Sequence, residues 1–131
     1  MIVDSSAIIA ILRQEPDAEL YARALSDAPG SRMSAATFLE AAIVADRAGN
    51  PLVSRRFDDI CRDAALVVVP FTEEHARIAR EAYRDFGRGS GHPANLNLGD
   101  CFAYALAKAA DEPLLYKGAD FGHTDVRSVL P

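Results

Sequence analysis

The chain has 131 residues, of which 14 are Lys or Arg and 19 are Asp or Glu, so its formal net charge is −5. This length leaves no room for two independent cores, and a content of 50% hydrophobic and 25% charged residues excludes a wholly disordered chain. Two cysteines exclude a small disulfide scaffold, and the acid excess excludes the strongly basic domain that is the simplest nucleic-acid signature.

Segments that predict strands are short and rich in β-branched residues, and segments that predict helices carry apolar residues at helical spacing. In chain order, the expected elements are a strand at 1–4, a helix at 7–13, a helix from Pro16 to about Ser26, a brief strand at 31–33, a helix capped by Ser34 and running to about Ala48, a helix at 52–64, a strand at 66–70, a helix capped by Thr72 and running to about Phe86, a helix at 99–110, and strands at 112–116 and 126–129.

The alternation of strands and helices predicts an α/β fold of three layers, in which a central, mainly parallel sheet lies between two layers of helices. The strand at 66–70 reads LVVVP, and this continuous apolar run predicts burial on both faces. The whole of residues 1–131 is expected to form a single domain. In such sheets the working site lies outside the carboxyl ends of the strands.

No targeting or membrane segment is predicted. The chain contains no run of about 18 apolar residues, so no membrane span and no membrane partner are expected. The start at 1–4 lacks the basic segment of a signal peptide. We therefore expect a cytoplasmic protein.

Three acidic residues stand out by their position in the predicted elements. Asp4 follows the first strand directly, where it is equally suited to cap the next helix or to serve a site. Glu40 lies in the middle of a helix, on a face that is otherwise apolar, so we expect it to point inward. Buried Glu is rare unless it is paired or binds a metal. Asp100 opens the apolar helix at 99–110, where the helix dipole alone would favour an acid.

Two further acids follow the strand at 112–116. Asp120 and Asp125 lie in a loop region, where Asp is often a simple turn former. A parallel sheet can nevertheless gather Asp4, Glu40, Asp100 and Asp120 in one crevice. Several carboxylates close together repel one another unless a cation is present. Oxygen-only ligands favour Mg²⁺ or Mn²⁺ over Zn²⁺.

These acids stand in segments that resemble the PIN-domain ribonucleases, and most closely the VapC-type toxins of prokaryotic toxin–antitoxin pairs. The matching segments, which span nearly the whole chain in order, are IVDSSA at 2–7, SAATFLE at 34–40, LNLGDC at 96–101 and LLYKGADF at 114–121. One departure concerns the closing segment, where many members read Thr-x-Asp-x-Asp-Phe. Here Tyr116 and Gly118 replace the Thr and the first Asp. The fourth acid is therefore Asp120, with Asp125 as the alternative.

The resemblance implies a Mg²⁺-dependent endoribonuclease, with Mn²⁺ as a possible substitute, that hydrolyses RNA phosphodiester bonds. It implies Asp4 and Asp100 as direct metal ligands and Glu40 as a group that binds the metal through water or orients the nucleophile. It implies that Asp120 assists from outside the direct coordination. Ser6 is expected to hydrogen-bond a carboxylate or a substrate phosphate.

The resemblance also implies two protein partners. One is a cognate VapB-like antitoxin, which would lie in an apolar groove and obstruct the acidic pocket. The other is a second copy of the chain in a homodimer. The helical segments at 7–12 and 52–61 are candidates for the groove because both carry more apolar residues than a surface helix requires.

Basic residues indicate where RNA phosphates would bind. Lys117 comes one residue after a predicted strand end and is the best single candidate for a phosphate contact. Four arginines form one stripe on the helix before the Gly-rich loop at 87–95, namely Arg77, Arg80, Arg84 and Arg88. Such a stripe can follow a phosphate backbone. Acids on the same helix make a solvated, salt-bridged face the more common outcome.

Other enzyme classes fit the sequence less well. A receiver domain needs an Asp after its third strand, where this chain has Phe71 and Thr72. A haloacid-dehalogenase phosphatase needs an Asp two residues after Asp4, where this chain has Ser6. The Gly-rich loop lacks the Lys and Ser or Thr of a P-loop. The remaining alternative is a catalytically weak or inactive PIN-like module that binds RNA or a protein.

Overall fold

The structure is a computed structural model that describes all residues, 1–131, as an open sheet between helices. Its strands are β1 (Ile2–Val3), β2 (Arg32–Ser34), β3 (Val67–Val69) and β4 (Leu114–Leu115). Its helices are α1 (Ser5–Leu12), α2 (Ala18–Asp27), α3 (Ala35–Asp46), α4 (Pro51–Asp63), α5 (Glu73–Phe86) and α6 (Leu98–Ala110), followed by the 3₁₀ helix η1 (Asp120–His123). The expected helices are all present, with bounds within a few residues of those predicted.

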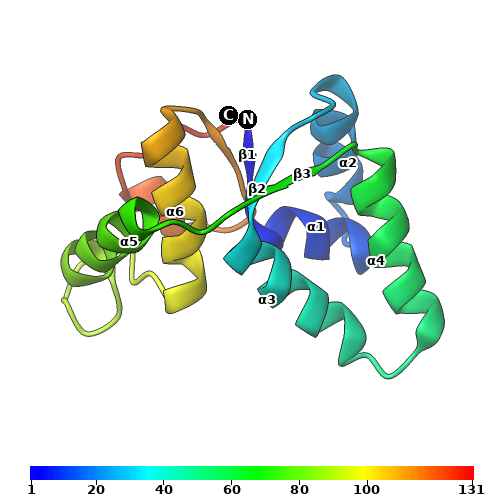
Figure 1. The fold of residues 1–131 in the computed structure, drawn as a ribbon, viewed down its shortest axis with the longest axis horizontal. Helices are drawn as coiled ribbons and strands as arrows, with labels where there is room; N and C mark the ends of the chain where they lie inside the picture. The colour runs from blue at the N-terminus through cyan, green and yellow to red at the C-terminus, as the bar shows by residue number, and fades with distance from the viewer.

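The four strands form one parallel sheet in the order β3-β2-β1-β4. Ile2 of β1 pairs with Arg32 of β2 on one side and with Leu114 of β4 on the other. Helices α5 and α6 cover one side of the sheet and α1 to α4 cover the other (Figure 1). The predicted three-layer α/β/α architecture is confirmed.

The sheet divides the core into two clusters because successive side chains of a strand point to opposite faces. Ile2 and Leu114 pack with the apolar side chains of α5 and α6. Val3 and Leu115 pack on the other face with those of α1 to α4. Each two-residue strand therefore contributes one side chain to each cluster, which fixes the register of the buried strands β1 and β4.

Two strand predictions are wrong in part. The strand at 66–70 is predicted to be buried on both faces, but β3 lies at the edge of the sheet, and Val67 and Val68 are 46% and 43% exposed. The segment 126–129 is not a strand. It forms a single bridge, Leu114 with Ser128, beyond the outer edge of β4. Both errors concern the sheet edges, which depend on strand order rather than on local sequence.

The connections bring several helix starts to one end of the sheet. Helix α1 follows β1 through Asp4, and α3 follows β2 through Ser34, so both helices begin at the carboxyl ends of neighbouring strands.

Helices α5 and α6 form a hairpin whose loop is closed by two backbone hydrogen bonds, Arg88 N to Leu96 O and Leu96 N to Phe86 O, both of 2.9 Å. No helix of the structure combines the length and the apolar character that a membrane crossing requires.

Candidate active site

Asp4 caps the first helix, which is one of the two functions that its position allowed. It is the N-cap of α1, and its Oδ2 accepts hydrogen bonds from the backbone N of Ser6 at 3.0 Å and from Ser6 Oγ at 2.6 Å. The residue is only 2% exposed, and its other oxygen, Oδ1, is buried without any hydrogen-bond partner. A buried carboxylate oxygen without a partner is costly, so Oδ1 is available for a cation.

Glu40 projects from α3 toward α6, as its apolar surroundings predicted. Its Oε1 accepts a hydrogen bond of 3.0 Å from the hydroxyl of Ser5, the first residue of α1. A Cβ atom placed on Gly99 of α6 would collide with Glu40 Oε2 and lie 2.6 Å from its Cδ. Glycine at position 99 is therefore what allows the Glu40 carboxylate to lie against the start of α6.

Asp100 is held at the start of α6 by reciprocal hydrogen bonds. The backbone N of Asp100 donates to Asn97 Oδ1 at 2.8 Å, and the backbone N of Asn97 donates to Asp100 Oδ2 at 3.0 Å. This capping box satisfies two N–H groups at the start of the helix and leaves Asp100 Oδ1 free of these bonds. The helix-start interpretation of Asp100 is thus correct and compatible with a second role.

The acids influence one another through space. Burial raises the pKa of Asp4 to about 7 against the lowering effect of its bonds to Ser6, and the charges of Asp100 and Glu40 raise it further. Burial also raises the pKa of Asp100, with further increases from the charges of Asp120 and Glu40, while its bond to Asn97 lowers it. Burial is thus the main cause of both raised pKa values, and the charges of Glu40 and, for Asp100, of Asp120 add to it.

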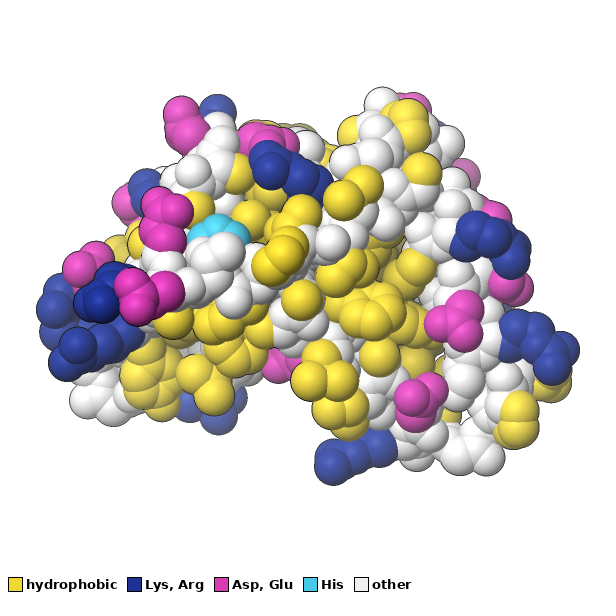
Figure 2. Space-filling view, in the orientation of Figure 1, with side chains coloured by type: hydrophobic (Ala, Val, Ile, Leu, Met, Phe, Trp, Pro, Cys, Tyr) yellow, Lys and Arg dark blue, Asp and Glu magenta, His cyan; other side chains and the backbone are white.

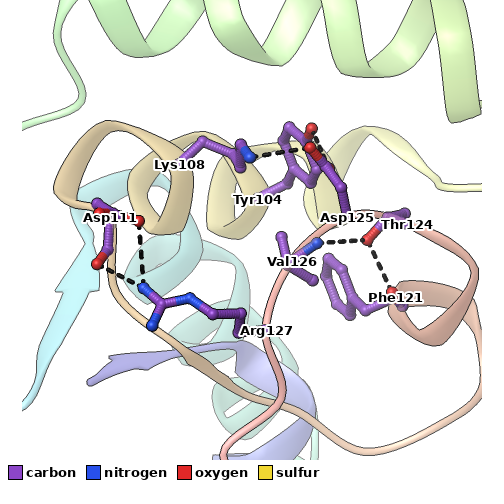
Figure 3. Close-up of polar contacts among 8 residues, drawn as sticks. All are labelled: Tyr104, Lys108, Asp111, Phe121, Thr124, Asp125, Val126 and Arg127. Atoms are coloured by element: carbon purple, nitrogen blue, oxygen red, sulfur yellow. Dashed lines mark hydrogen bonds and ion pairs between the residues drawn. The ribbon is translucent and has the colours of Figure 1, made fainter.

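Asp125 lies elsewhere and has other partners. The hydroxyl of Tyr104 donates to Asp125 Oδ1 at 2.7 Å, and the ammonium of Lys108 lies 2.8 Å from Oδ2 (Figure 3). The hydrogen bond from Lys108 is the main reason why the pKa of Asp125 is lowered. This network ties the segment after η1 to the second half of α6. Asp125 is therefore engaged by α6, whereas Asp120, the exposed first residue of η1, adds its charge to the surroundings of Asp100.

The two predicted substrate contacts are already engaged within the protein. Ser6 Oγ donates to Asp4 and also accepts a 2.9 Å hydrogen bond from the backbone N of Lys117, so it links β4 to the start of α1. The ammonium of Lys117 forms ion pairs with Glu15 and with Asp17, the latter at 2.7 Å. A substrate phosphate would have to displace these carboxylates from Lys117. Ser6 holds Asp4 in place.

The donor set fits a hard divalent cation. No three His, Cys, Asp or Glu side chains converge into a ready-made cage. Mg²⁺ does not require such a cage, because it usually keeps several waters and binds one or two carboxylates together with substrate phosphates. The unpartnered Oδ1 of Asp4 and the nearby charge of Asp100 are the kind of donors that such a site would need.

Sequence reasoning did not identify three residues that shape the site. Asn97 caps α6 and orients Asp100, Ser5 donates to Glu40, and Gly99 admits the Glu40 side chain. The spacing of Asn97 and Asp100 is a recognisable capping signal. A glycine inside a helix is also a known sign of close approach. No sequence pattern indicates the contact between Ser5 and Glu40, because it joins two helices that are far apart in sequence.

Comparison with known proteins gives matches over nearly the full length. The family model of the PIN domain matches residues 1–127. The VapC ribonuclease Mb0625 of Mycobacterium bovis and ribonuclease VapC28 of Mycobacterium tuberculosis are each 59% identical to this chain over 130 residues, covering 99% of this chain and 98% of the relative. Ribonuclease VapC of Mycolicibacterium smegmatis is 48% identical over 130 residues, covering 98% of this chain and 99% of that protein.

Two solved structures share the fold at low sequence identity. VapC20 of Mycobacterium tuberculosis, described as a toxin that cleaves the sarcin–ricin loop, has a TM-score of 0.75 at 15% identity and covers 99% of this chain and 98% of its own. A toxin–antitoxin complex from Klebsiella pneumoniae has a TM-score of 0.68 at 16% identity, with coverage of 92% and 88%. The acidic site, the three-layer fold and the full-length relatives agree: the chain belongs to the PIN domain family and, within it, to the VapC ribonucleases.

Proposed function

We propose that this chain is a cytoplasmic, metal-dependent endoribonuclease toxin of the VapBC type. The observation that carries the proposal is the buried, unpartnered Oδ1 of Asp4, next to the charges of Asp100 and Glu40. Relatives of 48% to 59% identity that are named ribonucleases support RNA as the substrate.

In this proposal the residues divide the work of phosphodiester hydrolysis. Asp4 and Asp100 hold Mg²⁺, or Mn²⁺ in its place. When bound, the ion supplies Lewis-acid chemistry that stabilises the charge developing on the scissile phosphate. Glu40, positioned by Ser5 and Gly99, orients the attacking water from the α3 side. Asp120 adds negative charge next to Asp100 and strengthens cation binding.

The metal requirement follows from the charge of the site. Without a cation, the carboxylates repel the phosphate of an RNA strand, and burial of Asp4 resists the charged state. A divalent cation reverses the sign of the pocket. The acid excess of the chain is therefore compatible with RNA cleavage when the site is loaded.

Removal of divalent ions is expected to abolish cleavage. Purified chain incubated with a structured RNA, such as ribosomal RNA, should cut it in Mg²⁺ or Mn²⁺ and leave it intact in EDTA. Electrophoresis of the RNA measures the result, and restoring Mg²⁺ to the same sample controls for denaturation. Undiminished cleavage in EDTA would contradict the proposal. RNA that is bound but never cut, in any metal, would instead support a non-cleaving module.

Substitutions at Asp120 and Asp125 are expected to separate activity from stability. Asp120→Ala should slow cleavage about 10-fold to 100-fold, the range found for groups that support a metal site from outside its ligands. Asp125→Ala should leave the rate nearly unchanged and lower the free energy of unfolding by about 1 kcal/mol, since Tyr104 loses its acceptor. Cleavage rates and urea unfolding measure the two effects. The reverse pattern would place Asp125 in the site.

We further propose a VapB-like antitoxin as partner, which binds beside the helices predicted from the sequence. A cavity of about 290 Å³ lies between α1, α2 and α4 and is lined in part by Ile11, Leu25 and Ile60. A second hollow of about 520 Å³ between α1, α3 and α4 combines apolar side chains with Arg13 and Arg47. Such surfaces suit a segment that carries both apolar and acidic residues. The Klebsiella toxin–antitoxin complex supports this type of partner.

We also propose that the chain forms a homodimer. Leu39 and Ile43 share one face of α3 and are 60% and 42% exposed, and Leu98 at the start of α6 is 63% exposed. Leu39 precedes Glu40 in α3, and Leu98 precedes Gly99 in α6. Burial of this apolar surface would favour association. Sedimentation of the purified chain tests the proposal, and a monomer at micromolar concentration would overturn it.

A further inference from the structure

The outer face of α5 carries three arginines that the acidic site does not use, and a fourth lies just after the end of the helix. We name Arg77, Arg80, Arg84 and Arg88 the α5 arginine stripe. The first three follow one another at intervals of three and four residues, so they lie on one side of the helix over about 10 Å. The opposite side of α5 is apolar and packs on α6 through Ala79 and Ala82.

The stripe has a definite local shape and charge. Arg77, Arg80 and Arg84 line a hollow of about 190 Å³ together with a single acid, Glu81. Figure 2 shows Lys and Arg side chains gathered at the end of the molecule where α5 lies. Three positive charges surround one negative charge in this hollow, in a chain whose net charge is −5. Glu73 and Asp85 pair with Arg77 and Arg84 beside the hollow, so the excess of positive charge is confined to the hollow itself and does not extend over the whole face of α5.

The ion pairs within this face leave the stripe available. Arg77 lies 3.4 Å from Glu73 and Arg84 lies 2.9 Å from Asp85, and all four side chains are largely exposed. Exposed pairs of this kind contribute little free energy, so a phosphate can replace the carboxylate. Arg80 and Arg88 form no ion pair at all. The salt-bridged face expected from the sequence is thus only partly formed.

The stripe leads toward the acidic site. Its last member, Arg88, follows the end of α5 and is hydrogen-bonded through its backbone N to Leu96 O at 2.9 Å, next to the start of α6. Asp100 lies in the first turn of α6. The loop that carries Arg88 is therefore fixed against the segment that leads into α6 and Asp100.

We propose that the α5 arginine stripe binds the phosphate backbone of RNA on one side of the cleavage site. This inference rests on the proposed ribonuclease function and adds a contact surface outside the acidic pocket. An RNA strand that enters the pocket at Asp100 would continue past Arg88 and along α5. Guanidinium groups suit such contacts because they bind phosphate oxygens in a bidentate manner. The contacts read the backbone and not the base sequence.

The test compares two triple variants that remove the same charge. The stripe variant is Arg77→Gln/Arg80→Gln/Arg84→Gln. The control variant is Arg23→Gln/Arg55→Gln/Arg62→Gln, which neutralises exposed arginines on α2 and α4, in the other helix layer. Because all six side chains are exposed, both variants should keep the fold, which circular dichroism checks. Binding of a fluorescent single-stranded RNA is measured in EDTA, where the RNA remains intact, over a range of salt concentrations.

The stripe variant is expected to reduce the slope of log Kd against log salt by about 2, because each phosphate that an arginine neutralises on a single strand adds about 0.7 to this slope. Its loss of affinity relative to the wild type should therefore grow about twentyfold between about 200 mM and about 50 mM salt. The control should keep the wild-type slope. Glu81→Gln, which removes the acid from the same hollow, should tighten binding.

Each outcome separates the inference from the proposed function. Equal losses of affinity in the stripe and control variants, or no loss in either, would overturn the proposal that the stripe binds RNA. So would a stripe variant that binds RNA normally but fails to bind the antitoxin, since the surface would then be a protein contact. Wild-type protein that binds RNA through the stripe but never cleaves it would overturn the ribonuclease proposal alone.

Discussion

Replacing Asp4 by Asn is expected to abolish RNA cleavage and to stabilise the metal-free protein at neutral and higher pH. Activity should fall by about 10³-fold or more, because the variant lacks the carboxylate proposed to hold the cation. The hydrogen bonds from Ser6 to Oδ2 can be kept by the Asn oxygen, so the cap of α1 survives. The loss of function would thus occur in a folded protein.

The gain in stability follows from the pKa of Asp4, which burial raises from 3.8 to about 7. Between these values the folded protein binds more protons than the unfolded chain, so the free energy of unfolding decreases as pH rises from about 4 to about 7. A shift of this size corresponds to as much as about 4 kcal/mol at pH 8. Asn carries no charge at any pH and escapes this loss.

Urea unfolding in EDTA at pH 5 and pH 8 measures the effect. The wild type should be clearly less stable at pH 8 than at pH 5, and Asp4→Asn should narrow that difference. Asp27→Asn, at an exposed position at the end of α2, is the matched control and should behave as the wild type does. If the pH dependence of Asp4→Asn equalled that of the wild type, burial of a charged Asp4 would not be the cause.

Replacing Gly99 by Ala is expected to damage the site without damaging the fold. The added methyl would take the space of the Glu40 carboxylate, which has to move away. Displacement of a positioned group by about 1 Å can lower a rate about 100-fold. Alanine also favours a helix over glycine by about 1 kcal/mol, so the stability of α6 should not fall.

A double-mutant cycle tests whether the methyl acts through Glu40. Cleavage rates are compared for Gly99→Ala, Glu40→Gln and the double variant. If both changes act on the same carboxylate, the double variant should be no slower than the slower single variant. Rates that multiply would show that Gly99→Ala acts elsewhere. A loss of stability in Gly99→Ala would show that the helix, and not the site, is strained.

The sequence was most informative about elements whose formation depends on a single segment of the chain. Apolar runs and capping residues predicted β1, β2, β4 and the helices, because burial and local hydrogen bonds fix these elements. Asp4 illustrates how one residue can suit two interpretations. One carboxylate oxygen caps α1, and the other is left for a cation. Local sequence suggested both roles but could not show that the cap uses one carboxylate oxygen only and leaves the other without a partner.

The sequence was least informative where distant segments meet. That β3 lies at an edge follows from strand order, and no local pattern reports this order. The position of Lys117 after a strand predicted a phosphate contact, but Glu15 and Asp17 reach its ammonium from the turn before α2. Asp120 and Asp125 are alike in sequence and differ in structure because only Asp125 meets Tyr104 and Lys108.

The central claim is that the carboxylates around Asp4 hold a divalent cation. The most direct test measures the change in Tm that Mg²⁺ produces in the wild type and in Asp4→Asn at pH 5.5 and pH 8. Mg²⁺ is expected to raise the Tm of the wild type, and to raise it more at pH 8, because the ion competes with the proton that Asp4 holds at low pH. Asp4→Asn should respond weakly at both pH values. A wild-type Tm that does not respond to Mg²⁺, or an equal response in Asp4→Asn, would contradict the claim.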